Sequence, residues 1–549
     1  MTDPVATSPI DDLRAALDDA WRALAPDDGG EARGRRPTLE RPKKAGHGDY
    51  ATNAALLLAP AAGRPPREVA EQLRSALSDS LGDRLERTEV AGPGFLNLFL
   101  SDAWYADAVD RILAAGEGFG AAVAERPERI LIEFVSANPT GPLTAASGRH
   151  AAYGDALARL LELAGHAVER EYYFNDAGTQ VLKLGESIRA RARGEEPPED
   201  GYQGDYVREL AEAIPGAGDA DPAELARKGV ELMFERIRRT LIAFRVRFDR
   251  WSSEASVFEG DPNAIQRAYA RLEEQGYLYR HEGALWLRTS ALGDDKDRVL
   301  ERSTGAPTYF ASDIAYHEAK LERGYDRLFN VLGADHHGYV ARMKAAFRAL
   351  GADPDMLEVP MLQFVHIVEH GERSSMSKRR GDFITLDELI AEIGVDATRF
   401  FMLSRSHDST VDLDLDLARE ESAENPVYYV QYAHARITSV LRKAGEARVE
   451  EAMRGGAPPA LHEAERRLVA RLLAFGDEVG EAAAKRAPHR ITAYVLDLAQ
   501  AFTAFYRDCQ VVGSEPEALE SFRLRLCVAT RRTIARSLGL LGVEAPDAM

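Results

Sequence analysis

The stretch Ile130-Leu-Ile-Glu-Phe-Val-Ser-Ala-Asn-Pro-Thr-Gly-Pro-Leu-Thr144 passes from an apolar run through a turn to the start of a helix. Residues 130–136 are apolar, β-branched and aromatic enough to predict a buried strand, which the prolines and glycine end. From Thr144, alanines and leucines recur at helical spacing as far as Gly165. A strand, a tight turn and a helix N-terminus offer free N–H groups and a positive dipole end, an arrangement that binds phosphate. Every βαβ unit has such a corner, so a purely structural role stays open.

The composition is that of a large globular chain. Its 549 residues exceed one core and indicate about three domains. No apolar run reaches membrane-spanning length, and Met1–Pro4 lacks the basic and apolar regions of a signal peptide, so we expect a cytoplasmic protein with no membrane partner. Cys509 and Cys527 form neither a disulfide framework nor a zinc set, and we expect buried thiols. The net charge of −20 argues against a polyanionic partner unless local basic patches bind it.

The sequence patterns divide the chain into three parts. Residues 1–120 combine a helix at 11–24 with a strand after the Gly-Pro-Gly turn in Ala91–Leu100, which predicts a small α+β domain. Residues 121–415 alternate strands with helices, and contain an insertion around 190–250 whose Gly- and Pro-rich turns predict a mobile surface segment. Residues 416–549 show only helical patterns, at 427–443, 462–480, 489–508 and 521–541.

The middle part contains several short apolar runs that end in charged or small residues, at 171–180, 248–254, 308–313 and 328–338. Their alternation with helical patterns predicts a parallel sheet, whose ligands bind at the carboxyl ends of the strands. Glu254, Asp313 and His336 fall at such expected ends. These three residues are therefore candidates for a binding site.

An ordered set of motifs over nearly the whole chain resembles the class I aminoacyl-tRNA synthetases, and the arginyl-tRNA synthetase family in particular. The motifs are Gly46–Asn53, Ala91–Asn97, Ser136–Pro142, Tyr172–Gly178, Gly293–Arg298, Tyr309–Asp313, Gly333–Gly338, Met376–Arg379 and Asn425–Arg436. The resemblance implies an α/β fold: a Rossmann-type class I catalytic domain, a small α+β N-terminal domain that contacts tRNA, and an all-α C-terminal anticodon-binding domain. It also implies activation of L-arginine with ATP and transfer to tRNA-Arg. We expect ATP with Mg²⁺ as the substrate complex, no prosthetic group or resident metal, and a monomer.

The resemblance assigns five residues to arginine. A guanidinium offers five donors and keeps its charge, so carboxylates and planar acceptors suit it. Glu254 and Asp313 match the acids that bind the guanidinium, and Tyr309 matches a ring that packs on it. Ser136 and Asn138 match positions that hold the ammonium and carboxylate ends. The ordinary alternative for each acid is a surface salt bridge.

The two class I signature motifs are both altered. The second, usually KMSKS, is Ser375-Met-Ser-Lys-Arg379, in which Lys378 would neutralise charge that develops on the pyrophosphate. The first, usually HIGH, is Thr144-Ala-Ala-Ser147, so both histidines and the glycine are absent. The hydroxyls of Thr144 and Ser147 can still donate to phosphates, and we assign these two residues catalytic roles beside Lys378. The full ATP set implied by the resemblance is Pro142, Thr144, Ala146, Ser147, His336, Met376 and Lys378.

His150 lies one turn further along the same helix. Because residues three and four apart share a helix face, Thr144, Ser147 and His150 form one row. Two interpretations stay open for His150. Its imidazole reaches the phosphates, directly or through Ser147 and a water, or it only packs within the domain.

The helix expected after Asn425 provides the candidate tRNA contacts. Tyr428, Tyr432 and His434 offer stacking faces, and Arg436 offers a phosphate contact. Two other functions remain open: a tRNA-binding paralogue that no longer makes adenylate, and an enzyme that adenylates a guanidino compound without tRNA. The guanidinium acids and Lys378 favour an active enzyme, and the two flanking domains favour one that uses tRNA.

Overall fold

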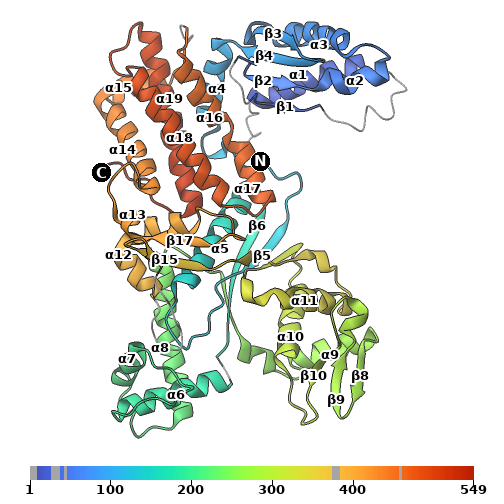
Figure 1. Ribbon diagram of the computed structural model, residues 1–549, viewed down its shortest axis with the longest axis vertical. Helices are drawn as coiled ribbons and strands as arrows, with labels where there is room; N and C mark the ends of the chain where they lie inside the picture. The colour runs from blue at the N-terminus through green and yellow to red at the C-terminus, as the bar shows by residue number, and fades with distance from the viewer. Residues whose placement is uncertain (1–8, 26–36, 43–45, 177, 374–383, 457–459) are drawn as a thin grey trace.

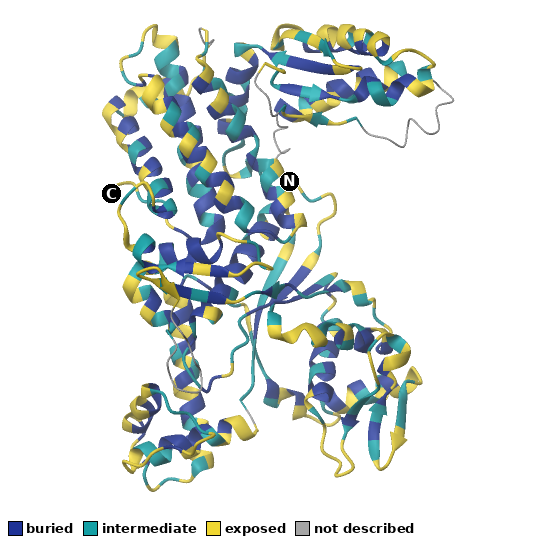
Figure 2. Cartoon of the chain, viewed as in Figure 1, coloured by how far each residue is buried: buried dark blue, intermediate teal, exposed yellow. Residues whose placement is uncertain are grey.

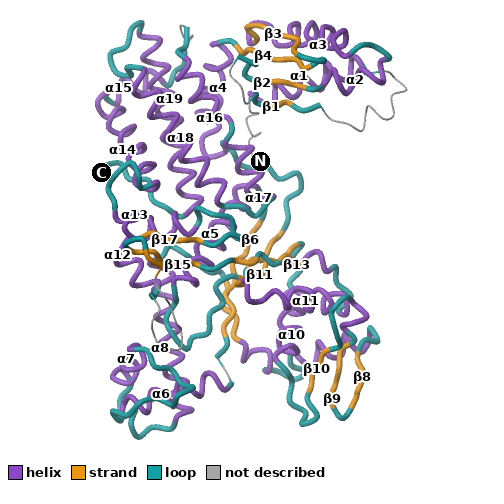
Figure 3. The backbone as a smooth tube through the Cα atoms, viewed as in Figure 1, coloured by secondary structure: helices purple, strands orange, loops and turns teal. Residues whose placement is uncertain are grey.

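The computed structural model describes the whole chain except residues 1–8, 26–36, 43–45, 177, 374–383 and 457–459 (Figure 1). The helical C-terminal part and the N-terminal domain lie at one end of the long axis, and two smaller lobes lie at the other. The central sheet lies between the helical C-terminal part and the two smaller lobes (Figure 3). No helix among the described residues is long and apolar enough to cross a bilayer.

The N-terminal domain is a four-stranded antiparallel sheet with helices packed against it. The strand order is β1-β2-β4-β3, and the Gly-Pro-Gly turn joins β3 to β4. Its elements are α1 (Pro9–Leu24), β1 (Leu39–Glu40), β2 (Tyr50–Thr52), α2 (Ala54–Ala62), α3 (Pro66–Leu81), β3 (Leu85–Ala91) and β4 (Phe95–Leu100). Asp49 accepts hydrogen bonds from the Leu100 amide (2.7 Å) and the Tyr105 hydroxyl (2.6 Å), which ties the sheet to α4 (Asp102–Ala115). The predicted α+β character is confirmed.

The central sheet is five-stranded and parallel, as predicted, in the order β13-β11-β5-β6-β7. Its strands are β5 (Arg129–Glu133), β6 (Ala167–Phe174), β7 (Arg250–Ser253), β11 (Arg327–Asn330) and β13 (Leu357–Glu358). The strand predicted at 130–136 ends early, because Val135 and Ser136 have φ of 68° and 41°. Positive φ is rare for a β-branched residue, and here it turns the chain away from the sheet at the carboxyl end of β5.

Helix α5 (Ala145–Ala164) follows that turn and is mostly buried. Its boundaries agree with the prediction, since Thr144 caps the first turn and Gly165 ends the helix in the left-handed region. Gly148 on its first turns faces another segment closely: a Cβ there would lie 2.8 Å from Leu386. The helix therefore packs tightly against the segment that follows residue 383.

Two predictions in the middle part are wrong. Residues 308–313 are not a strand but the start of α10 (Tyr309–Glu322), because the Thr308 hydroxyl accepts from the Ala311 amide (3.4 Å) and caps a helix. The insertion is a helical lobe of α6 (Thr179–Ala192), α7 (Asp205–Ala213) and α8 (Pro222–Ala243), and its Gly- and Pro-rich stretches are the connections between these helices. The run at 308–313 is short and apolar, and its period does not separate helix from strand.

The rest of the middle part adds three small sheets and their helices. The sheet orders are β10-β9-β8, β12-β14 and β16-β15-β17. The elements are η3 (Glu254–Phe258), α9 (Ala264–Glu274), β8 (Leu278–His281), β9 (Ala284–Leu287), η4 (Thr289–Leu292), β10 (Arg298–Glu301), β12 (Leu332–Gly333), η5 (Ala334–His336), α11 (His337–Ala349), β14 (Met361–Leu362), β15 (Val365–Glu369), β16 (Glu372–Arg373), α12 (Leu386–Met402), β17 (Val411–Asp414) and α13 (Leu415–Arg419).

The C-terminal part is helical throughout its described residues, as predicted. It contains α14 (Pro426–Ala444), α15 (Glu446–Ala452), α16 (Glu463–Leu473), α17 (Phe475–Ala484), α18 (His489–Asp508) and α19 (Glu517–Leu541). The single helix predicted at 462–480 is two helices that meet at Ala474. Cys509 and Cys527 are buried free thiols, and burial raises their pKa to about 11 and about 12.

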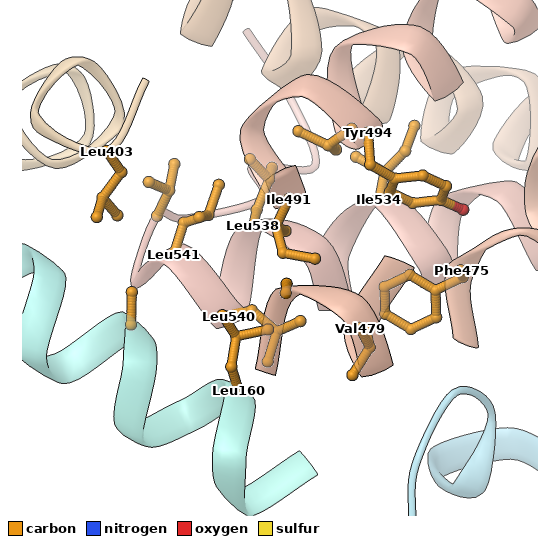
Figure 4. Packing of buried hydrophobic residues seen from close by; sticks show 14 of the residues in the cluster. Leu160, Leu403, Phe475, Val479, Ile491, Tyr494, Ile534, Leu538, Leu540 and Leu541 are labelled. Atoms are coloured by element: carbon orange, nitrogen blue, oxygen red, sulfur yellow. The ribbon is translucent and has the colours of Figure 1, made fainter. Parts of the chain in front are cut away.

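A large apolar core joins the N-terminal domain, the central sheet and the C-terminal helices, and a second core lies among α9, α10, α11 and the sheet. Buried side chains follow the inner faces of the helical bundle down to the central sheet (Figure 2). Leu160 of α5 and Leu403, just after α12, lie beside Leu538 and Leu541 of α19 and Val479 of α17 (Figure 4). The C-terminal helices therefore support the helix that begins at the predicted phosphate corner.

Candidate functional site

A cavity of ≈ 370 Å³ lies at the carboxyl ends of β5, β6 and β11. Its lining comes from the ends of these strands, from α5, from one face of α10 and from the segment around η5. The lining residues are Glu133, Val135, Ser136, His150, Tyr173, Asp313, Tyr316, His317, Asn330, Val331, Leu332, Gly333, His336 and Tyr339. Ser136, Asp313 and His336, predicted to bind substrates, thus share one cavity at the sheet edge where a ligand was expected.

The cavity is strongly anionic at the α10 side. Burial, together with the charges of Glu254 and Glu133, raises the pKa of Asp313 from 3.8 to about 7. Burial and the neighbouring Asp176 also raise the pKa of Glu254. A cationic ligand beside Asp313 and Glu254 would favour the ionised form of both carboxyl groups, so these residues are suited to bind one.

Glu133 is the third carboxylate of this group, and the sequence interpretation missed it. Its side chain forms a buried ion pair with Lys320 and accepts from the Ser136 hydroxyl (2.9 Å). Lys320 also donates to the Asn330 side chain (3.1 Å), whose amide lies 2.8 Å from the His317 ring. The sequence offered one signal for Glu133, its position at the end of β5. The acids predicted from the sequence, Glu254 and Asp313, follow other apolar runs. The pairing leaves Asp313 and Glu254 as the carboxylates that a ligand would neutralise.

Glu254 is placed by the turn after β7. It begins η3, where the Asp176 carboxylate accepts from the Ser253 hydroxyl (2.6 Å) and from the Ala255 amide (3.1 Å). Glu254 is buried and lies near enough to raise the pKa of both Asp313 and Tyr173, although it is not part of the cavity lining. The predicted pair of acids is therefore brought together by two different elements, η3 and α10.

Three of the five predicted arginine residues lie outside the cavity lining, namely Glu254, Tyr309 and Asn138. Tyr309 is 66% exposed at the start of α10, and Asn138 is exposed in the turn after β5. Ser136 lines the cavity, but its hydroxyl already donates to Glu133 and accepts from the Tyr173 amide (3.2 Å). Ser136 therefore offers a ligand mainly its backbone and one lone pair of the hydroxyl.

The N-terminus of α5 is less open than the sequence predicted. The Ala145 amide donates to the Ile384 carbonyl (3.1 Å), and the Ser147 amide donates to the Thr144 hydroxyl (3.4 Å). The Thr144 and Ser147 hydroxyls lie 3.3 Å apart, and Ala146 is exposed. Within the described part of the chain, the Ala146 amide is the one N–H of these first three residues without such a partner. Pro142 lies in the same turn, half-buried.

Arg149 fixes the other side of this corner. Its buried guanidinium donates to four carbonyls of two loops, those of Gln363 (2.6 Å), Phe364 (3.4 Å), Ser406 (2.9 Å) and Ser409 (2.7 Å). The predicted ATP residues Met376 and Lys378 lie outside the described residues. The described segments on either side of residues 374–383 are both bonded to the beginning of α5, through Arg149 and Ala145.

A second cavity of ≈ 300 Å³ lies in the helical part, between α14 and α18. It is lined by Glu421, Ser422, Ala423, Tyr428, Tyr429, Tyr432, Ala433, Arg436, Phe502, Thr503 and Tyr506. The Tyr428 and Tyr432 rings are parallel within 9°, and the Arg436 guanidinium lies 4.7 Å from the Tyr432 centroid and 5.1 Å from that of Tyr506. Three predicted tRNA-binding residues thus meet here. His434, which we also expected to offer a stacking face to tRNA, is instead buried, and its ring is hydrogen-bonded to the Pro546 carbonyl (2.8 Å).

Family models match three stretches of the chain. Residues 11–100 match the family described as the arginyl tRNA synthetase N terminal domain, residues 206–440 match the catalytic domain of class I (R) tRNA synthetases, and residues 430–549 match the DALR anticodon binding domain.

Curated relatives match over nearly the full length. The arginine–tRNA ligase of Frankia alni is 46% identical, and that of Shouchella clausii is 43% identical, each over 525 residues that cover 93% of this chain and 94% of the relative. The solved structure of the Thermus thermophilus arginyl-tRNA synthetase is 26% identical, with a TM-score of 0.75 over 98% of this chain and 99% of that one. On these matches, the chain belongs to the arginyl-tRNA synthetase family of class I aminoacyl-tRNA ligases.

Proposed function

We propose that this chain activates L-arginine with ATP and transfers it to tRNA-Arg, and that it does so with the altered signature motif at Thr144–Ser147. The observation that carries the proposal is the cavity at the sheet edge, which Asp313 lines, together with Glu254, which is buried near enough to raise the pKa of Asp313. A tRNA-binding paralogue without chemistry would not need carboxylates held unneutralised in a buried site, because they destabilise the empty protein.

Arginine binds with its guanidinium at Asp313 and Glu254. The two carboxylates offer charged acceptors to a planar group with five donors. The Glu133 charge is already shared with Lys320, so it shapes the site more than it pairs with the ligand. Tyr309 and Asn138, exposed in this structure, close on the guanidinium and the ammonium ends when arginine enters, and Ser136 contributes its backbone.

ATP enters with Mg²⁺ as its substrate complex and places its α-phosphate beside the arginine carboxylate. The carboxylate oxygen attacks that phosphorus, the bond to the bridging oxygen breaks, and pyrophosphate leaves. Thr144, Ser147 and the Ala146 amide donate to phosphate oxygens at the start of α5, and Pro142 and His336 border the nucleotide. Lys378, with Met376 beside it, supplies the cation that stabilises the leaving pyrophosphate.

The tRNA binds across the other domains. Tyr428 and Tyr432 stack on nucleobases, and Arg436 holds the rings in place and faces the backbone. The residue ranges 1–120, 121–415 and 416–549, the first with a tRNA contact of its own, remain our proposed division. We propose a monomer that acts in the cytoplasm, where translation uses charged tRNA.

Charging of purified tRNA by the full chain tests the proposal. Radioactive arginine should become acid-precipitable with tRNA-Arg and ATP, and radioactive lysine should not, because its point charge cannot use two carboxylates in the same way. A protein that binds tRNA-Arg but charges it with neither amino acid would support the paralogue instead. Adenylate formed from arginine without any charging would support the third alternative, a tRNA-independent enzyme.

A further inference from the structure

His150 is part of the lining of the cavity at the sheet edge. It extends from the second turn of α5 and lines the cavity together with Ser136, Val331 and His336. The carboxylate side, with Asp313, is where the guanidinium binds under the proposed function, on which this inference rests. Three methylene groups separate a guanidinium from the α-carbon of arginine, so a bound arginine places its ammonium group, and the nucleotide joined to it, in the rest of the cavity that His150 lines.

The imidazole of His150 is neutral and has one ring nitrogen already engaged. Burial and the neighbouring Arg149 lower the pKa of His150 to about 4. The ring donates one N–H to the carbonyl of Val331. A neutral imidazole has one donor and one acceptor, so its second nitrogen presents a lone pair. A lone pair repels a phosphate oxygen, and direct donation to the phosphates, one of the two roles expected from the sequence, does not fit this arrangement.

We propose that His150 accepts a hydrogen bond from the reacting substrates where the amino acid meets the nucleotide. Two groups there carry suitable donors, the α-ammonium of arginine and the ribose hydroxyls of ATP. Both are N–H or O–H donors that a fixed lone pair can select, and neither requires His150 to change its protonation. His150 is thereby a substrate-binding residue that sets specificity at the centre of the cavity, one turn beyond the altered motif.

The test compares three variants at this position. His150→Ala removes the acceptor, whereas His150→Asn and His150→Gln keep one acceptor and one donor on the same group, as the neutral imidazole does. His281→Ala, on the exposed β8–β9 hairpin, is the control. Calorimetry measures arginine binding without ATP, and pyrophosphate exchange measures the KM of ATP, 2′-deoxy-ATP and 3′-deoxy-ATP. Thermal unfolding checks that each variant is folded.

We expect different results depending on whether the α-ammonium of arginine or a ribose hydroxyl of ATP donates to His150. If the ammonium is the donor, arginine Kd rises about 10- to 100-fold in His150→Ala, the usual effect of losing a hydrogen bond to a charged group, with ATP KM unchanged. If a ribose hydroxyl is the donor, ATP KM rises instead, and the penalty for one deoxy-ATP disappears in His150→Ala. In either case Asn or Gln recovers part of the loss.

Unchanged arginine Kd, unchanged ATP KM and an unchanged deoxy-ATP penalty in a folded His150→Ala would overturn the proposal. A loss that neither Asn nor Gln recovers would also overturn it, since packing alone would then explain the residue. Arginine binding by calorimetry needs no catalysis, so these results remain readable even if the wild-type chain shows no exchange. Absence of exchange in the wild type would count against the proposed function instead.

Discussion

At the scale of single residues, the site depends on one carboxylate that is costly in the empty protein. Asp313 is half-buried, and its desolvation together with the charges of Glu254 and Glu133 raises its pKa to about 7. Such a group is unfavourable until a cation arrives, and it therefore selects for one. The same logic gives two predictions, one for substitution and one for pH.

Asp313→Asn should raise the KM for arginine by orders of magnitude and change the KM for ATP much less. The substitution keeps the volume but removes a charge that faces the guanidinium, an interaction worth about 2–5 kcal/mol when desolvated. Steady-state pyrophosphate exchange measures both constants. Glu318→Gln is the matched control, because Glu318 is another buried carboxylate of α10 with a raised pKa but does not line the cavity. Equal arginine KM in both variants would place the guanidinium elsewhere.

Arginine affinity should weaken as pH falls through about 7. In the empty site Asp313 is increasingly protonated below that pH, and a bound guanidinium favours the ionised form. Binding must then displace a proton, which raises Kd by up to about tenfold for each further pH unit. Calorimetry in buffers of different ionisation enthalpy should detect the released proton near pH 6. In Asp313→Asn, the Kd of arginine should not change with pH in this range. A wild type whose Kd is equally independent of pH would contradict the raised pKa of Asp313.

At the scale of elements, the sequence was most informative where its pattern was long and regular. Helices α5 and α18 agree closely with their predicted bounds, because helical periodicity is long in both, and in α5 it coincides with the caps at Thr144 and Gly165. The strand predicted at residues 308–313 is wrong, since six residues are too few to show a period, and Thr308 caps the helix that begins at Tyr309. The cavity lining was only partly predictable. Glu133 and Tyr316 belong to it through strand order and the packing of α10, which spacing along one chain does not contain.

A buried charge cluster joins α5, α8, α12 and α19. The Arg399 guanidinium donates to Asp155 of α5 (2.5 Å), to the Phe244 carbonyl after α8 (2.9 Å) and to the Leu541 carbonyl of α19 (2.7 Å). Gly542 ends α19 with φ of 67°, and a Cβ there would overlap this guanidinium. The end of the C-terminal bundle is thereby fixed against the helix of the active site.

Gly542→Ala should destabilise the protein by at least about 1–3 kcal/mol, from the left-handed backbone and the displaced guanidinium. Gly539→Ala is the control, because Gly539 lies inside α19 and a Cβ there would contact nothing within 4 Å. That change should be neutral or stabilise by about 1 kcal/mol. Urea unfolding measures both. Equal effects of the two substitutions would show that the Arg399 cluster does not constrain the end of α19.

At the scale of the whole molecule, the anticodon-binding part cannot be removed without affecting the catalytic part. The described core runs continuously from the N-terminal helices through α5 to α19. A chain cut near Glu420 would expose the face of α5 around Leu160, so loss of activity in it would not report on tRNA. Single substitutions in the second cavity, between α14 and α18, test tRNA binding more directly.

Tyr432→Ala should weaken tRNA-Arg binding by about 1–3 kcal/mol, the usual contribution of one stacked base, and leave arginine KM in tRNA-independent assays unchanged. Tyr432 is 40% exposed and holds no core position, so the fold should tolerate the change. Filter binding at fixed salt measures the effect, with Tyr279→Ala on β8 as the control. Normal tRNA affinity in Tyr432→Ala would show that the second cavity is not part of the tRNA interface.

The central claim is that a class I site without the histidines of its first motif still activates arginine. Arginine-dependent exchange of radioactive pyrophosphate into ATP, measured with and without tRNA-Arg, tests it most directly. We expect exchange that requires arginine, is not supported by lysine, and is lost in Asp313→Asn at low arginine concentration. A folded protein that binds tRNA-Arg yet shows no arginine-dependent exchange in either condition would contradict the claim.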